Sequence, residues 1–183
     1  QVLTHKDQKA LEALAREYTQ QIDKRIIRPE LITELVIEGF HGHRGVIVAK
    51  SASGNIEGVL SYELFMPKNV YEFESKLPKM AGEEIVDGSG RVYEKAPLSR
   101  FKGLRNYTFT KALALLGLIE SFRKGTGRKL VETLKSLPNI EGIFILYPTD
   151  ATDLYKKMRF RESGLYAYNR DNPIMVWMKS GKY

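Results

Sequence analysis

A basic turn that contains two glycines is the part of this sequence best suited to chemistry. It reads Arg123-Lys124-Gly125-Thr126-Gly127-Arg128. Glycine at alternate positions lets a backbone come close to an anion, and a helix that begins there points its unpaired N–H groups at that anion. Three cationic side chains and the helix dipole favour the same negative charge. The turn is therefore predicted to bind phosphate, and a pyrophosphate would fit.

The segments on either side of this turn are predicted to hold it in place. The apolar run 113–119 before it has the length of a strand that is buried on both faces. After it, Leu130, Val131, Leu134 and Leu137 fall on one stripe of a helix. A strand, an anion-binding turn and a helix thus follow one another without a break.

The rest of the chain is predicted to supply a sheet and more helices. Apolar spacing indicates a short strand at 2–3, a helix ending near Ile22 and a second helix from Pro29. Later elements are expected as a hairpin of 45–50 with 56–65, a strand at 142–147, a short helix at 151–158, and a hairpin of 162–168 with 173–179.

The segment 67–106 breaks this pattern, because it has no regular period and contains several prolines and glycines. Its apolar residues indicate an irregular insertion that packs over the 45–65 hairpin and is not a linker.

Composition limits the class of protein. The 183 residues predict a single domain, 1–183, that is large enough to bury its own core. The chain has no cysteine, which excludes disulfides, thiolate zinc sites and cysteine nucleophiles. No apolar run approaches the roughly 20 residues of a membrane span, so a cytoplasmic location is expected. The net charge of +7 favours a polyanionic partner, either nucleic acid or a phosphorylated cofactor.

Two motifs, together with this order of elements, resemble the GNAT N-acetyltransferase superfamily. The segment 122–127 matches the family's pyrophosphate loop, Q/R-x-x-G-x-G/A, except that Phe122 replaces Q or R. The segment 151–160 matches A-x-x-F/L-Y-x-K-x-G-F, except that Arg159 replaces the glycine. The resemblance implies an α/β fold with a mixed, mostly antiparallel sheet, splayed between its fourth and fifth strands where acetyl-CoA inserts. The insertion would then help to shape the acceptor pocket.

The resemblance also implies a reaction and its site. An acetyl or longer acyl group would pass from CoA to a primary amine by direct attack, without a metal. A backbone N–H among Leu115, Leu116 and Gly117 would polarise the thioester carbonyl, and pantetheine would pair along the strand from Leu116 through Gly117 and Leu118 to Ile119. The turn 123–128 would hold the pyrophosphate.

Tyr155 matches the tyrosine that protonates the departing thiolate in many members of the family. The alternative is a tyrosine that only packs in the core. The general base is less clear, because Lys111 stands where some members have a glutamate. Glu120 is the nearest carboxylate and our candidate, although a glutamate at the end of a strand beside Arg123 and Lys124 is more often a solvated ion-pair partner. Glu63 and Glu94 are weaker candidates.

Two other groups of residues could have a function, but the sequence does not favour one for them. His41 and His43 could ligate a metal, but no third ligand follows at a suitable spacing, so no metal site is predicted. The basic residues Lys156, Lys157, Arg159 and Arg161 could contact the 3′-phosphate of CoA or RNA, with a solvated surface as the default.

The expected partner is a small-molecule or peptide amine. Three alternatives stay open: a toxin-like enzyme that acetylates charged tRNA, a degenerate CoA-binding regulator, and a basic nucleic-acid-binding domain. Nucleic acid is the less favoured partner, no membrane contact is expected, and a monomer or a homodimer fits the sequence.

Overall fold

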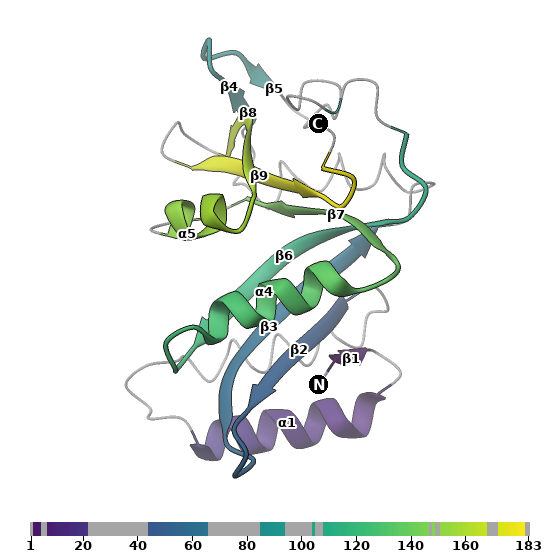
Figure 1. Ribbon diagram of the computed structural model, residues 1–183, viewed down its shortest axis with the longest axis vertical. Helices are drawn as coiled ribbons and strands as arrows, with labels where there is room; N and C mark the ends of the chain where they lie inside the picture. Colours follow the sequence, from purple (N-terminus) through teal and green to yellow (C-terminus); the bar gives the residue numbers. More distant parts are fainter. Residues whose placement is uncertain are drawn as a thin grey trace. The chain divides into compact units, whose positions relative to one another are not determined.

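The computed structural model describes residues 2–4, 7–21, 44–65, 85–93, 104, 108–146, 148, 151–167 and 172–181 (Figure 1). The chain divides into two compact units, which we describe in turn. The first comprises Gln1–Leu64 with Gly117–Ser136, and the second comprises Phe65–Leu116 with Leu137–Tyr183. Strand β6 (Ala112–Ser121) contributes its first half to the second unit and its second half to the first.

The first unit is built on three antiparallel strands and two helices. Its strands are β1 (Val2–Thr4), β2 (Arg44–Lys50) and β3 (Ile56–Phe65), with β2 in the middle. Its helices are α1 (Gln8–Gln21) and α4 (Thr126–Ser136). The predicted hairpin of β2 and β3 is confirmed, and its turn is closed by the N–H of Ser51, which donates to the carbonyl of Asn55.

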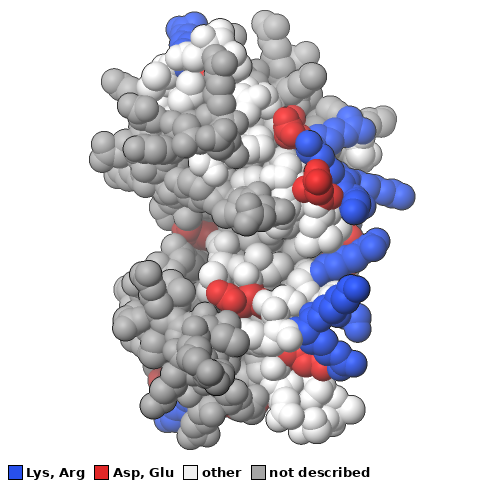
Figure 2. Space-filling view, turned by 90° about the vertical axis from the view of Figure 1, so that its left-hand side faces the viewer, with Lys and Arg blue, Asp and Glu red and all other residues white. Residues whose placement is uncertain are grey.

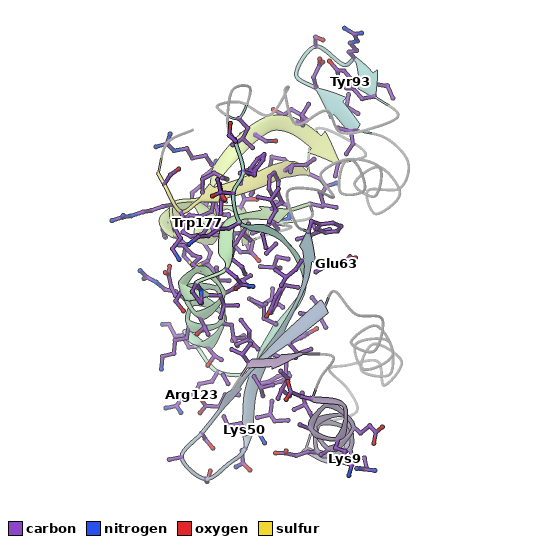
Figure 3. All side chains as sticks on the ribbon, turned by 90° about the vertical axis from the view of Figure 1, so that its right-hand side faces the viewer. Lys9, Lys50, Glu63, Tyr93, Arg123 and Trp177 are labelled. Carbon is purple, nitrogen blue, oxygen red and sulfur yellow. The ribbon has the colours of Figure 1, made fainter. Side chains whose placement is uncertain are left out.

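Helices α1 and α4 lie on opposite faces of these strands (Figure 3). Ala10 and Leu14 of α1 pack against a cluster that includes Val46 and Val48. On the other face, Leu130, Val131 and Leu134 of α4 are buried, as their helical spacing predicts. Gly58 permits this packing, since a Cβ there would lie 2.9 Å from Cγ2 of Thr126 and 2.7 Å from the carbonyl oxygen of Glu120. The start of α4 is therefore held close to β3.

The second unit contains the remaining strands and the short helix α5 (Thr152–Lys157). The first half of β6 runs parallel to β7 (Ile140–Ile145), and β9 (Pro173–Met178) is antiparallel to both β7 and β8 (Arg161–Ala167). The core of this unit consists of Phe65, Ile85, Leu104, Leu113, Leu115, Phe144, Leu146, Leu165, Ala167, Ile174, Val176 and Met178.

The insertion is more regular than the sequence indicates. It includes β4 (Ile85–Asp87) and β5 (Val92–Tyr93), which form a hairpin paired with β8. Asp87 closes the turn, because its Oδ1 accepts hydrogen bonds from the N–H groups of Ser89 and Arg91. Bonds from Ser89, Arg91 and Tyr93 lower the pKa of Asp87 below its usual range. The expectation that the insertion packs over the 45–65 hairpin stays a prediction.

Strand pairing joins the strands in the order β1-β2-β3-β6-β7-β9-β8-β4-β5. The pairing of β6 with β7 runs from Ala112 to Leu115, and β6 continues beyond it to Ser121. The predicted fold class is confirmed: a mixed, mostly antiparallel sheet flanked by helices.

The prediction that the central strand is buried on both faces holds only for part of it. In β6, the residues Ala112 to Leu116 are buried, whereas Gly117 is exposed and the residues after it are partly exposed or exposed. The helix predicted from Pro29 and the pair His41 and His43 lie outside the described residues, as does most of the insertion. Among the described helices, none is long and apolar enough to cross a membrane.

Candidate active site

The predicted anion-binding turn joins β6 directly to α4. Gly125 has a φ of +86°, which favours glycine, and no heavy atom lies within 4 Å of where its Cβ would be. The N–H of Thr126 donates to the carbonyl of Arg123 (3.1 Å), and the N–H of Lys129 donates to that of Gly125 (3.2 Å). The backbone at Gly125 therefore adjoins open space at the positive end of an 11-residue helix.

Ser121 holds this turn in shape. Its hydroxyl donates to the carbonyl of Arg123 (2.9 Å) and accepts from the N–H of Gly127 (3.1 Å). One end of the turn is thus tied to the first turn of α4. We did not single out Ser121 from the sequence, although a serine at the end of a strand before a glycine-rich turn is a common cap for such N–H groups.

Arg123 is paired with a residue of β3. Its Nη1 donates to Oε1 of Glu57, and this bond is the main cause of the raised pKa of the guanidinium. The N–H of Phe122 donates to the carbonyl of Glu57 (2.9 Å), so the turn is anchored to the same residue twice. Figure 3 shows Arg123 at the end of this unit where Lys50 also lies. Lys124 and Arg128 are exposed beside the turn.

Glu120 does not pair with Arg123, since Arg123 pairs with Glu57. Among the described residues, the structure gives Glu120 no ion pair. Partial burial raises the pKa of its carboxyl above the usual value. A carboxylate with a raised pKa is a better proton acceptor, which suits a general base.

Gly117 and Leu118 of β6 lie against Ser61 of β3. The N–H of Leu118 donates to the hydroxyl of Ser61 (2.9 Å). A Cβ on Gly117 would lie only 2.8 Å from the same Oγ, so Ser61 faces two successive residues of β6. We did not single out Ser61 from the sequence.

The structure places neither of the two carboxylates proposed as weaker candidates for the base, Glu63 and Glu94, at the turn. Glu63 is buried on β3, at the opposite end of that strand from Glu57. Glu94 lies outside the described residues.

Lys111, which stands where some members of the family have a glutamate, is held in place at the start of β6. Its backbone N–H donates to the buried carboxylate of Glu141 (2.6 Å), and its Nζ donates to the carbonyl of Pro138 (3.2 Å). Glu141 therefore anchors the start of β6.

Tyr155 belongs to the second unit. Its side chain is 4% exposed and meets the ring of Phe160 edge-on, with the centroids 5.5 Å apart. Burial raises the pKa of the phenol, so the phenol keeps its proton at neutral pH. Among the described residues, the structure shows no hydrogen-bond partner for its hydroxyl.

The basic cluster after Tyr155 is exposed. Lys156 pairs with Glu162 (2.8 Å), and Lys157 and Arg159 point to solvent. Arg159 has a φ of +65°, the left-handed conformation that the glycine of the family motif adopts easily. Figure 2 shows many Lys and Arg side chains projecting from the described surface, with Asp and Glu between some of them. Within the described residues, no group of His, Cys, Asp and Glu could hold a metal ion.

Comparison with known proteins identifies the fold. No family model and no curated protein matches the sequence. Among solved structures, arylalkylamine N-acetyltransferase 2 from Aedes aegypti is similar with a TM-score of 0.53 and 12% identity, covering 98% of this chain and 97% of that one. The chain has the GNAT acetyltransferase fold. The strands that the sequence analysis numbers as the fourth and fifth, at 113–119 and 142–147, correspond to β6 and β7 of the structure.

Two further solved structures are similar to this chain to a comparable degree. AtaT, in complex with acetyl-methionyl-tRNAfMet, has a TM-score of 0.52 and 14% identity, covering 98% of this chain and 94% of that one. A structure described as a bacterial toxin has a TM-score of 0.51 and 10% identity, covering 83% and 77%. At these identities the likeness shows the fold alone.

Proposed function

We propose that this protein is an acyltransferase that moves an acetyl or longer acyl group from CoA to a primary amine by direct attack. One observation carries the proposal. A glycine-rich turn with open space at Gly125 leads into the N-terminus of α4, in a chain with the GNAT fold.

The residues of the turn fit the pyrophosphate of CoA. Gly125 leaves room for an anion to approach the backbone, and Lys124 and Arg128 supply positive charge beside it. Arg123 is engaged with Glu57, so its contact with a phosphate stays a prediction. In our proposal the turn 123–128 lies against the pyrophosphate at Gly125, where the backbone adjoins open space, and pantetheine lies along β6 from Leu116 to Ile119.

Two side chains have the properties that the chemistry requires. Tyr155 is protonated at neutral pH and can donate a proton to the departing thiolate. Glu120 has a raised pKa and can accept a proton from the acceptor amine, directly or through water. These roles require no covalent intermediate on the protein.

The acceptor that we propose is a small molecule or peptide with a primary amine. Charged tRNA is the second candidate, favoured by the net charge of +7 and by the exposed cations of 156–159. The structural likeness to AtaT in complex with an acetylated tRNA is consistent with it.

An acetylation assay distinguishes these acceptors. The protein is incubated with acetyl-CoA labelled in its acetyl group and, separately, with a polyamine, an arylalkylamine, a peptide with a free N-terminus, and charged tRNA. We expect label in at least one free amine, independent of RNA and little affected by salt. Transfer to tRNA alone, weakening steeply with salt, would favour the second candidate. Transfer to none of the four would contradict the proposed function.

The pH dependence of the reaction tests Glu120. A base works only when deprotonated, so activity should fall as the pH drops through the pKa of Glu120, which lies above its ordinary value. With a peptide α-amine, whose pKa is about 8, log(kcat/KM) should rise with pH. Its slope should be near one between the pKa of Glu120 and that of the amine, and near two below the pKa of Glu120. Glu120→Gln should keep a slope of one throughout and lower kcat/KM by about 100-fold or more.

If the Glu120→Gln protein still shows the change of slope from one to two at low pH, a group other than Glu120 is responsible for that change. Glu132→Gln serves as a control, because Glu132 is an exposed carboxylate on α4 that pairs with Lys135. It should leave both slopes unchanged.

A further inference from the structure

The N-terminus of α4 is closed largely by bonds within the turn itself. The first four N–H groups of an α-helix have no partner inside the helix. Three of them have acceptors in this structure: the N–H of Thr126 donates to the carbonyl of Arg123, that of Gly127 to Oγ of Ser121, and that of Lys129 to the carbonyl of Gly125. The N–H of Arg128 has no acceptor among the described residues. Of the three acceptors, only Ser121 uses its side chain, so this bond can be removed by substitution.

Ser121 braces the turn at three points. It is the last residue of β6, and its hydroxyl donates to the carbonyl of Arg123 while accepting the N–H of Gly127. One oxygen atom therefore joins the end of the strand, the turn and the first turn of the helix. A Cβ on Gly127 would lie 3.6 Å from Cβ of Ser121, so the two ends of the turn are close together.

The glycines of the turn make this brace important for a ligand. Glycine lets the backbone approach an anion, but it also has more conformational freedom to lose than any other residue. If a turn becomes ordered only when its ligand arrives, the lost freedom lowers the affinity. The bonds to Glu57 hold the turn at Phe122 and Arg123, before the first glycine. Ser121 reaches Gly127, so its hydroxyl is the anchor that spans both glycines.

We propose that Ser121 is a positioning residue for the pyrophosphate of CoA. This inference rests on the proposed function. The hydroxyl fixes the turn before the ligand binds, so that the backbone at Gly125 stays open and the N–H of Arg128 stays available to a phosphate oxygen. Ser121 need not touch the phosphate, because its hydroxyl already has two partners in the turn. Its effect on affinity is therefore expected only for ligands that carry the pyrophosphate.

The test compares Ser121→Ala with a matched control by calorimetry. Ser136 is an exposed serine at the other end of α4, and its Oγ donates to the carbonyl of Thr133 (2.7 Å). Ser121→Ala should weaken the binding of acetyl-CoA at least fivefold, as expected for the loss of one capping bond. Binding of S-acetylpantetheine, which lacks the pyrophosphate, should stay within twofold of the wild type. Ser121→Thr, which keeps the hydroxyl, should restore most of the affinity, and Ser136→Ala should change neither ligand's affinity.

Three results with folded Ser121→Ala protein would overturn the inference. Unchanged affinity for acetyl-CoA would show that the brace does not matter to the ligand. An equal loss for both ligands would show a general defect of the fold. A gain in affinity for acetyl-CoA would show that the hydroxyl competes with the phosphate for the N–H of Gly127. Failure of the wild-type protein to bind acetyl-CoA would instead contradict the proposed function.

Discussion

Replacing Gly127 with valine is expected to abolish the binding of acetyl-CoA while the protein stays folded. A Cβ at this position would make only ordinary contacts, the nearest being 3.6 Å from Cβ of Ser121. Valine also has no lower helix propensity than glycine, so α4 should still form. Its branched side chain would keep the pyrophosphate away from the N–H groups at the start of the helix. Calorimetry should show at least a hundredfold loss of affinity, about 2.8 kcal/mol.

Gly127→Ala is the matched control for this experiment. The pyrophosphate-loop pattern of the GNAT family accepts alanine at this position, so the alanine protein should bind nearly as well as the wild type. Gly125 is less suitable for this test, because its φ of +86° strains any other residue and would mix folding with binding. Unchanged affinity in a folded Gly127→Val protein would show that the turn does not hold the cofactor.

Tyr155→Phe is expected to slow the chemical step without weakening binding. Phenylalanine keeps the ring and its edge-on contact with Phe160. The hydroxyl has no partner among the described residues, so its removal should leave the melting temperature unchanged or slightly higher. Turnover should fall at least tenfold, about 1.4 kcal/mol in the activation free energy, with a similar dissociation constant for acetyl-CoA.

Tyr62→Phe is the control for the loss of a buried phenol. Tyr62 is 3% exposed, and burial raises its pKa as it does that of Tyr155. The Tyr62→Phe substitution should leave turnover within twofold of the wild type. If Tyr155→Phe also turns over normally under conditions where chemistry limits the rate, Tyr155 is a core residue and water supplies the proton.

Local patterns predicted most of the described fold. Leu130, Val131 and Leu134 are buried because their helical spacing places them on one face, and the hairpin expected at 45–50 and 56–65 is formed by β2 and β3. The turn between β6 and α4 also lies where its glycines indicate, and Gly125 there has a φ of +86°. Such features depend on residues close together in the sequence, which is why spacing and turn chemistry reveal them.

Contacts between distant residues could not be predicted in this way. The bond of Leu118 to Ser61 joins residues 57 positions apart, and the pair of Arg123 and Glu57 joins residues 66 apart. The pairing of β4 with β8 likewise depends on partners that the insertion does not contain. The alternative ion pair of Glu120 with Arg123 is absent from the described residues, where Arg123 pairs with Glu57 of β3. The sequence therefore indicated the turn, whereas the residues that hold the turn in place were found only in the structure.

The direct test of this account is a calorimetric titration of the wild-type protein with acetyl-CoA and, separately, with S-acetylpantetheine, which lacks the pyrophosphate. We predict saturable binding of acetyl-CoA at one site per chain, and binding of S-acetylpantetheine at least a hundredfold weaker, because the turn at Gly125 would have no phosphate to hold. A folded protein that does not bind acetyl-CoA, or that binds both compounds equally well, would contradict the account.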